Sequence, residues 1–297
     1  MLKMKKKEKN KLSPILMVLP LIILFVLLAI VPFVYMIYLS FYEYNLAEGG
    51  KPTFIGFGNY ISIFSDEVAR SSISFTALIC IAVPVELFLG IAIAFFVRGI
   101  VAEKPIRSVL LLPMMIPAVV AGVAWKMLFN YEYGPINYFL SFFNIPKISW
   151  LGDYFYSRLG IILIDIWQWT PFIFLILYAG IQSIPKELSE AGKVDGASSM
   201  DIIKYIELPL LTPLIAVVLI IRLIDVLKIF DIVYMVTWGG PGYATHTLSY
   251  YIYKVGLSYG WDIGYASALS LLLLVVIVIL INLLMKFLHL KESFELK

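Results

Sequence analysis

The chain contains few of the residues on which enzymes and disulfide-rich proteins depend. Its 297 residues include a single cysteine and two histidines, and Asp, Glu, Lys and Arg together make up 14%. The one thiol, Cys80, can form neither an internal disulfide nor a set of metal ligands. His246 and His289 lie far apart in the sequence and no carboxylate cluster stands out. We therefore expect no metal site and no catalytic residues in this chain.

The sequence also has no phosphate-binding loop and little excess charge. The segment Gly49-Gly50-Lys51-Pro52 has neither the spacing nor the Ser or Thr of a P-loop, so we expect no nucleotide site. The net charge is +3, and the basic residues gather in the N-terminal segment and in short loops. That pattern sets the orientation of a membrane protein and does not indicate nucleic-acid binding.

Apolar residues are what the chain has in excess. They make up 61% of the sequence, whereas a soluble globular domain has about half. Six runs are long enough to cross a bilayer, which takes roughly 20 apolar residues. In lipid they must be helical, because every backbone polar group has to be satisfied internally. The runs are about Pro14–Ser40, Ser72–Phe96, Ile106–Phe129, Gly160–Ile181, Leu208–Tyr234 and Ile263–Leu288.

The distribution of Lys and Arg predicts how these helices are oriented. The N-terminal segment, the second-to-third loop, the fourth-to-fifth loop and the C-terminal segment together hold 15 basic residues, and the loops on the other side hold 5. Cytoplasmic flanks carry an excess of Lys and Arg. We therefore expect a multi-pass protein of the cell membrane with both termini in the cytoplasm. The first run exceeds the apolar core of a signal peptide, about 7 to 15 residues, so we expect it to remain uncleaved.

The cytoplasmic loop between the fourth and fifth runs has a pattern of its own. Pro185 followed by Lys186-Glu187 predicts the start of a short helix with an acidic first turn, and Gly196 interrupts it. Ser198 is a candidate cap for a second stretch, Met200–Glu207, whose isoleucines share one face. A pair of short amphipathic helices on a membrane surface is suited to docking in a partner's groove.

This loop resembles the coupling loop of the permease subunits of ATP-binding-cassette (ABC) importers. The pattern of that family is Glu-Ala-Ala, three residues, Gly, nine residues, Ile, one residue and Leu-Pro. The matching residues here are Glu190, Ala191, Gly196, Ile206 and Leu208-Pro209, at the same spacing. The one departure is Gly192 at the second Ala, which is also small but lowers helix propensity by about 1 kcal/mol. The resemblance implies an ATPase-coupling set of Glu187, Glu190, Ala191, Gly192, Asp195, Gly196, Ala197, Ile206, Leu208 and Pro209.

Further motifs resemble the carbohydrate branch of the same family, close to the first permease of maltose-type and glycerol-phosphate-type systems. They are Phe57-Gly58-Asn59-Tyr60; Arg107 with Leu112-Pro113, Pro117 and Trp125; Trp167 with Pro171; and Asp231, Tyr234 and Thr237 with Gly239-Gly240-Pro241. The resemblance implies an all-α membrane protein with the type I importer permease fold. It would have a basic cytoplasmic tail at 1–12, a six-helix transmembrane permease domain at 13–290 with its coupling loop at 184–213, and a cytoplasmic tail at 291–297.

The resemblance also implies an assembly. The chain would form half of a sugar translocation path in a bacterial inner membrane. Its partners would be a second permease subunit, giving a heterodimer, two ATPase subunits that hold ATP and Mg²⁺, and an extracellular solute-binding protein. The chain itself would need no cofactor and would be no enzyme.

Charged and aromatic residues inside two predicted helices are candidates for the substrate path. Arg222, Asp225, Lys228 and Asp231 lie three residues apart, a spacing that allows mutual pairing. Charges within a membrane helix usually face an interior cavity and pair. They could contact sugar hydroxyls or form an ion-pair ladder against the partner permease, and Glu86 is expected to pair in a buried position. The fourth run contains Trp167 and Gln168. A tryptophan face can stack on a sugar ring, and a glutamine amide can form hydrogen bonds with its hydroxyl groups. The substrate-path candidates are Trp167, Gln168, Arg222 and Asp225.

Two other functions are less consistent with the sequence. A secondary transporter would often show internal repeats and an intramembrane ion-coupling site, and the sequence has no repeat. An ABC permease for a polyol, a glycerol phosphate or an anionic oligosaccharide is the nearest alternative, because Arg222 and Lys228 are compatible with an anionic group.

Overall fold

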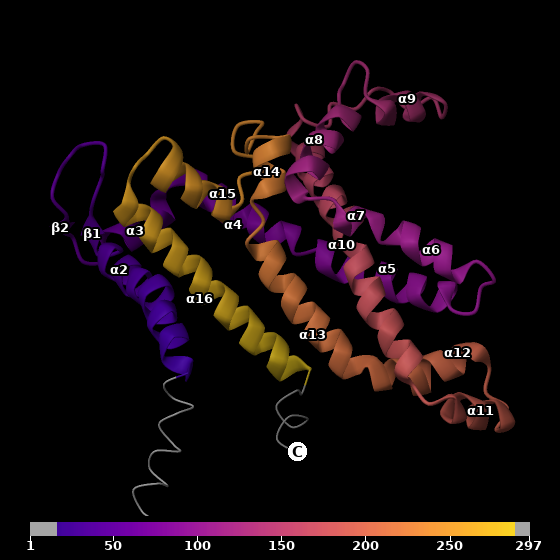
Figure 1. Cartoon of the computed structure of the whole chain (residues 1–297). Coiled ribbons are helices and arrows are strands. Elements are labelled where there is room, and N and C mark those ends of the chain that lie inside the picture. The colour runs from indigo at the N-terminus through magenta and orange to yellow at the C-terminus, as the bar shows by residue number, and fades with distance from the viewer. Residues whose placement is uncertain (1–16, 289–297) are drawn as a thin grey trace, which may run out of the picture. The chain divides into compact units, whose positions relative to one another are not determined.

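The computed structural model describes residues 17–288, whose regular structure is almost entirely helical (Figure 1). The predicted tails at 1–12 and 291–297 lie outside the described residues. Within residues 17–288, five helices are long and apolar enough to cross a membrane. They are Met17–Leu39, Glu67–Val97, Tyr154–Ser183, Ser199–Val236 and Ile263–Phe287. These helices correspond to the first, second, fourth, fifth and sixth predicted runs.

The third predicted run, 106–129, is not one continuous helix. It is divided into α6 (Glu103–Leu110), α7 (Leu112–Met115) and α8 (Ala118–Leu128). The break before α8 falls at Ile116, whose backbone is extended with φ −81° and ψ 126°. The residue before a proline is disfavoured in the helical region, so Pro117 accounts for this interruption. Pro117 itself then caps α8.

The described chain divides into two compact units. The first comprises the residues up to Ile63 together with Ile252–Leu272, and the second comprises Phe64–Tyr251 together with the residues from Leu273. The first unit contains η1 (Val26–Ile30), α2 (Val31–Leu39), β1 (Tyr42–Glu43), β2 (Thr53–Phe54), most of α3 (Gly58–Ser65), η3 (Lys254–Ser258) and the start of α16 (Ile263–Phe287). Strands β1 and β2 are antiparallel, with Tyr42 opposite Phe54.

Asn59, in the Phe57-Gly58-Asn59-Tyr60 motif, holds the end of the first spanning helix in place. Its side-chain amide donates to the carbonyl oxygens of Ser40 at 3.0 Å and Tyr42 at 2.9 Å. The hydroxyl of Tyr60 donates to Ser40 Oγ at 2.8 Å. The bond to Ser40 satisfies a carbonyl group that a helix leaves without a partner at its C-terminus, and the other two bonds hold the chain where it leaves α2.

The second unit is built around α10 (Tyr154–Ser183). Its other helices are α4 (Glu67–Ile79), α5 (Ala82–Val97), α6, α7, α8, α9 (Pro135–Ser141), α11 (Lys186–Val194), α12 (Ser199–Ile202), η2 (Ile203–Glu207), α13 (Leu208–Leu227), α14 (Asp231–Val236) and most of α15 (Leu248–Tyr253). Helix α10 packs along α5 and against α13 (Figure 1). In its most apolar window 56% of the residues are buried, against 33% for Glu67–Val97, so α10 is the central helix of this unit.

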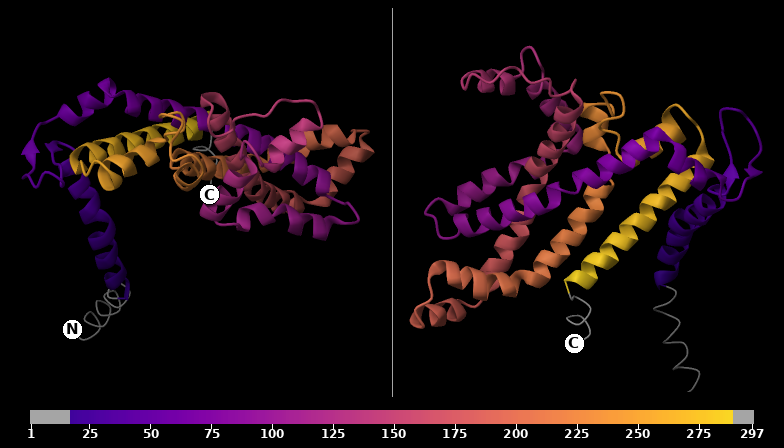
Figure 2. Two further views of the ribbon diagram at one scale, coloured as in Figure 1. Left: turned by 90° about the horizontal axis from the view of Figure 1, so that it is seen from above. Right: turned by 180° about the vertical axis from the view of Figure 1, so that it is seen from behind.

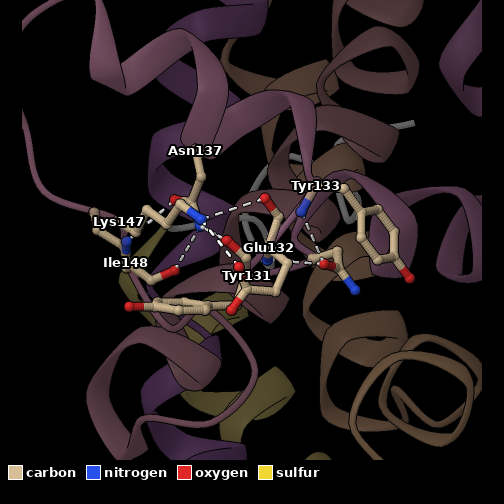
Figure 3. A network of polar contacts seen from close by, with 7 residues as sticks. Tyr131, Glu132, Tyr133, Asn137, Lys147 and Ile148 are labelled. Atoms are coloured by element: carbon tan, nitrogen blue, oxygen red, sulfur yellow. Dashed lines mark hydrogen bonds and ion pairs between the residues drawn. The ribbon is translucent and has the colours of Figure 1, made fainter.

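The connection between α8 and α10 is organised around one buried amide. The Asn137 side chain donates to the carbonyl oxygens of Tyr131 at 3.2 Å and Ile148 at 3.0 Å (Figure 3). Its own carbonyl oxygen accepts from the backbone of Ile148 at 3.1 Å and from Trp150 Nε1 at 3.2 Å. The Asn137 amide thus forms hydrogen bonds through both its nitrogen and its oxygen, as expected for a buried polar group. These bonds hold together a connection that has little regular structure.

Helices α5 and α10 approach each other closely at Gly90. A Cβ atom at this position would lie 2.7 Å from Ile173 Cγ2 and 3.1 Å from the Phe174 backbone nitrogen. We expect Gly90→Val to lower the free energy of unfolding by about 1–3 kcal/mol through overpacking. Thermal unfolding of the detergent-solubilised protein measures this change. Ala92→Val, at an exposed position of the same helix, is the control. Equal effects of the two substitutions would contradict the packing argument.

Candidate functional site

The loop between α10 and α13 folds as the two short helices that the sequence predicts. Helix α11 has Pro185 as its N-cap and Glu187 in its first turn. Ser198 caps α12 through a capping box with Asp201, in which each side chain bonds the other residue's backbone N–H. The loop lies at one end of the second unit, between the ends of α10 and α13 (Figure 2).

Gly196 allows the turn between these two helices. Its φ is +86°, in the left-handed region that L side chains rarely adopt, and no heavy atom lies within 4 Å of a Cβ built there. The preceding residue, Asp195, is the C-cap of α11 and donates its backbone N–H to Ala191 at 3.0 Å. The backbone conformation at this position therefore requires a glycine. The space around the turn is open.

Gly192, the one departure from the Glu-Ala-Ala pattern, lies where the two helices of the loop meet. A Cβ at this position would lie 3.0 Å from Ile206 Cδ1 and 3.5 Å from Ile202 Cγ1. The first distance is tighter than ordinary contact in a packed interior. Loss of the methyl group thus allows the isoleucine face of α12 and η2 to pack closely on α11, which offsets part of the lost helix propensity.

The residues predicted to contact the ATPase are mostly on the surface of the loop. Ile206, Leu208, Gly192 and Ala197 are half-buried, and they support the loop from within. The remaining predicted residues are exposed: Glu187, Glu190, Ala191, Asp195, Gly196 and Pro209. The loop therefore presents a contiguous stretch of α11 and its following turn to the outside.

A cluster of three ionisable side chains lies between the helices of the second unit. Arg222 of α13 donates through Nε and Nη2 to both oxygens of Glu86 on α5, at 2.7 and 2.9 Å. Its Nη2 also donates to Asp165 Oδ2 on α10 at 2.8 Å. The side chains of Glu86, Asp165 and Arg222 are at most 2% exposed. The predicted buried pairing of Glu86 is confirmed.

The spacing along the fifth run allows pairing, but the described residues of this run do not pair with one another. Among the ion pairs of residues 17–288, none joins Arg222 to Asp225, and Lys228 and Asp231 form none. Helix α13 ends at Leu227, and Lys228 has a non-helical backbone, so the regular spacing stops there. Arg222 instead bonds the carboxyl groups of Glu86 and Asp165 on two other helices, because these groups are buried with it whereas Asp225 is only half-buried.

A cavity of about 280 Å³ opens beside this cluster. It is lined by residues that include Asp165, Trp169, Arg222, Asp225 and Lys228. The Arg222 guanidinium lies 5.0 Å from the centre of the Trp169 ring, a cation–π contact. Carboxyl groups and an aromatic ring thus meet in one cavity, an arrangement that can bind hydroxyl groups and pack against a sugar ring.

The structure brings together two of the four predicted substrate-path residues. Arg222 and Asp225 line this cavity. Trp167 instead lies edge-on to Trp125 at 5.4 Å between ring centres and borders a separate apolar pocket. Gln168 is buried and donates to the Ile116 carbonyl at 3.0 Å, at the break before α8.

Asp165 and Trp169 of α10 also line this cavity and are not among the four predicted residues. They are four residues apart on α10 and therefore share one helical face. That spacing was visible in the sequence, but it does not reveal which face of the helix meets α13.

Comparison with known proteins identifies the kind of chain that carries this loop and cavity. Residues 86–291 match the family described as binding-protein-dependent transport system inner membrane component. The trehalose/maltose transport system permease protein MalF of Thermococcus litoralis is 36% identical over 74% of each chain. The sulfoquinovosyl glycerol transport system permease protein SmoG of Agrobacterium fabrum is 39% identical, over 79% of this chain and 76% of that one.

A solved structure supports the same assignment. A chain of a bacterial ABC transporter involved in the import of the acidic polysaccharide alginate superposes with a TM-score of 0.83, covering 97% of this chain and 98% of that chain at 25% identity. The fold and the sequence thus define a multi-pass permease of the type I importer architecture. The chain belongs to the family of binding-protein-dependent transport system inner membrane components, which are transport subunits rather than enzymes.

The buried charge cluster predicts an unusual pattern of stability. We expect Arg222→Met to lower the free energy of unfolding by about 3–5 kcal/mol, because Glu86 and Asp165 lose their buried cation. Adding Glu86→Met and Asp165→Val should restore most of that loss, since an apolar replacement removes the unpaired charges. Thermal unfolding in detergent measures both variants. Lys228→Met removes an exposed cation of the same cavity and should stay within about 0.5 kcal/mol of the parent. A triple variant no more stable than Arg222→Met would argue against this account.

Proposed function

We propose that this chain forms half of the translocation path of an ATP-driven, binding-protein-dependent importer of sugars or oligosaccharides. The observation that carries the proposal is the 184–213 loop, whose two short helices expose the Glu190–Gly196 stretch between α10 and α13. Relatives named for trehalose, maltose and sulfoquinovosyl glycerol support a saccharide cargo. The loop also favours an ATP-driven importer over a secondary transporter.

The proposed assembly contains a second permease subunit in a heterodimer, two ATPase subunits and an extracellular solute-binding protein. The ATPases would hold the ATP and Mg²⁺, because this sequence has no P-loop. The alginate transporter, which has been solved in complex with its periplasmic protein, supports the binding-protein partner. The excess of Lys and Arg in the flanks and in the 184–213 loop supports a cytoplasmic position for both termini and for the loop.

The geometry indicates how the loop would act on the path. Helices α11 and α12 are continuous in sequence with α10 and α13, which carry Asp165 and Arg222. Movement of the loop when the ATPases close would therefore displace the two helices that border the cavity. An ion cluster with two partners on one guanidinium can hold these helices in a defined arrangement in each state.

The charges of the cavity favour a neutral saccharide over an anionic one. The Arg222 guanidinium is already bonded to Glu86 and Asp165, so it has little capacity for a substrate anion. Asp225, which has no ion pair among the described residues, is a free acceptor for hydroxyl groups. Lys228 remains as the cation that a glycerol phosphate or an acidic oligosaccharide would require.

Substitution of Gly196 tests the coupling role of the loop. Gly196→Leu should leave membrane insertion intact and reduce sugar uptake by about 5-fold or more, the lower end of typical coupling between sites. Uptake of labelled trehalose and maltose into proteoliposomes containing the whole transporter, with ATP hydrolysis recorded in parallel, gives the measurement. Gly49→Leu is a matched control, because Gly49 also has a positive φ, +64°, and open space around it. Unchanged uptake in Gly196→Leu would count decisively against this role.

Substitutions in the cavity test the proposed sugar path. We expect Trp169→Ala and Asp225→Ala each to reduce the uptake of trehalose or maltose by roughly tenfold, the effect of losing one charged hydrogen bond or one stacked ring. Trp167→Ala tests the alternative placement of the path beside the apolar pocket. If both cavity variants took up sugar at the wild-type rate and Trp167→Ala lost uptake, the path would instead run beside the apolar pocket.

A further inference from the structure

The turn that joins α5 to α6 is tied to the coupling loop by one ion pair. Arg98 Nη1, at the C-cap of α5, donates to Glu207 Oε1 at 2.7 Å. The same Glu207 oxygen accepts from Ser189 Oγ of α11 at 3.2 Å. Glu207 therefore joins three segments, which are the end of α5, the first helix of the loop and the beginning of α13.

This carboxylate is buried although the family pattern leaves its position free. Glu207 is the residue between Ile206 and Leu208-Pro209, and its side chain is 3% exposed. Burial of an ionised carboxylate is unfavourable unless a cation and hydrogen-bond donors compensate for the lost water. The exposed pair Lys147–Glu132, with side chains 47% and 71% exposed, carries no such requirement.

The pair lies at the edge of an open space between the α5–α6 turn and the loop. A cavity of about 470 Å³ has Arg98, Gly99 and Glu103 in its wall, together with Ser189, Glu190 and Lys193 from the loop. Across that space, the direct polar contacts among the described residues run through Glu207. The ion pair therefore adds a polar connection to the apolar contacts at the end of α5, where Val97 shares a buried cluster with Leu211 of α13.

The other end of this turn is fixed to α10. Tyr178 of α10 donates its hydroxyl to Glu103, and Gln182 donates to the Tyr178 oxygen at 2.7 Å. The Arg107 guanidinium lies 5.0 Å from the centre of the Tyr178 ring. The α5–α6 turn is thus held both to the last turns of α10 and, through Arg98, to the residues that follow the loop.

We propose that Arg98 and Glu207 are positioning residues that make the coupling loop and the α5–α6 turn move as one body. This inference rests on the coupling role proposed above for the 184–213 loop. Displacement of α11 by the ATPase is then transmitted to the end of α5, which carries Glu86 of the buried charge cluster. The loop would act on the path through α5 as well as through the two helices to which it is directly joined.

The transport assay separates this role from a merely stabilising one. In the assembled transporter, Arg98→Ala and Glu207→Gln should lower the amount of maltose moved per ATP hydrolysed by about 5-fold or more, while ATP hydrolysis continues. The exchanged pair Arg98→Glu with Glu207→Arg should recover much of this ratio. Lys147→Ala, which removes the exposed pair, should leave the ratio at the parent value. An unchanged ratio in Arg98→Ala, or equal loss of hydrolysis and transport, would overturn the proposal.

A distance measurement tests the same proposal without any sugar. Spin labels at Val101→Cys and Lys193→Cys, in a Cys80→Ala background of the whole transporter, report the separation of the α5–α6 turn from α11, because both positions are exposed. We expect the same distance without nucleotide and with bound ATP in the parent, and a shifted or broadened distance in Arg98→Ala. The proposal would be refuted if ATP binding changed the distance between the labels in the parent transporter as much as in the Arg98→Ala variant. If the parent transporter kept a constant distance but did not transport maltose, only the proposed cargo would be contradicted.

Discussion

The arrangement of the second unit depends on one guanidinium that is shared between two carboxylates. Arg222 reaches Glu86 and Asp165 from a third helix, and all three side chains are almost completely removed from solvent. Such a cluster is favourable only while all of its members are present, because each one left alone would be a buried, unpaired charge. It therefore fixes how α5, α10 and α13 meet, more strictly than their apolar surfaces could.

The same constraint bears on the proposed substrate path and on its proposed connection to the coupling loop. The cavity beside the cluster is bordered by α10 and α13, which are also the helices that the loop joins. Helix α5 contributes Glu86 in its first half and Arg98 at its end, so it meets the loop at one end and the cluster further along. In the proposed mechanism, movement of the loop reaches the cavity through the three helices that the Arg222 cluster joins.

Much of this organisation could be read from the sequence, and the exceptions have physical causes. Long apolar runs must become helices in lipid, and the Pro185, Gly196 and Ser198 signals act within a few residues of where they stand. The third run was different, since a proline can either be tolerated or interrupt a helix, and neighbours such as Gln168 decide which by satisfying the freed carbonyl. The structure places Trp169 rather than Trp167 beside Arg222. The sequence could not show this, because composition does not reveal which face of α10 meets α13.

The sequence by itself determined the class of protein, the spanning helices and the position and local fold of the coupling loop. These depend on the hydrophobicity of the long apolar runs, which belong in lipid, and on short-range backbone chemistry. The tertiary structure alone decided the partners of Arg222, the residues that line the cavity and the burial of Glu207 beside Arg98. Those contacts join residues as far apart as 86 and 222, and their energies depend on the loss of water that occurs only when the helices pack.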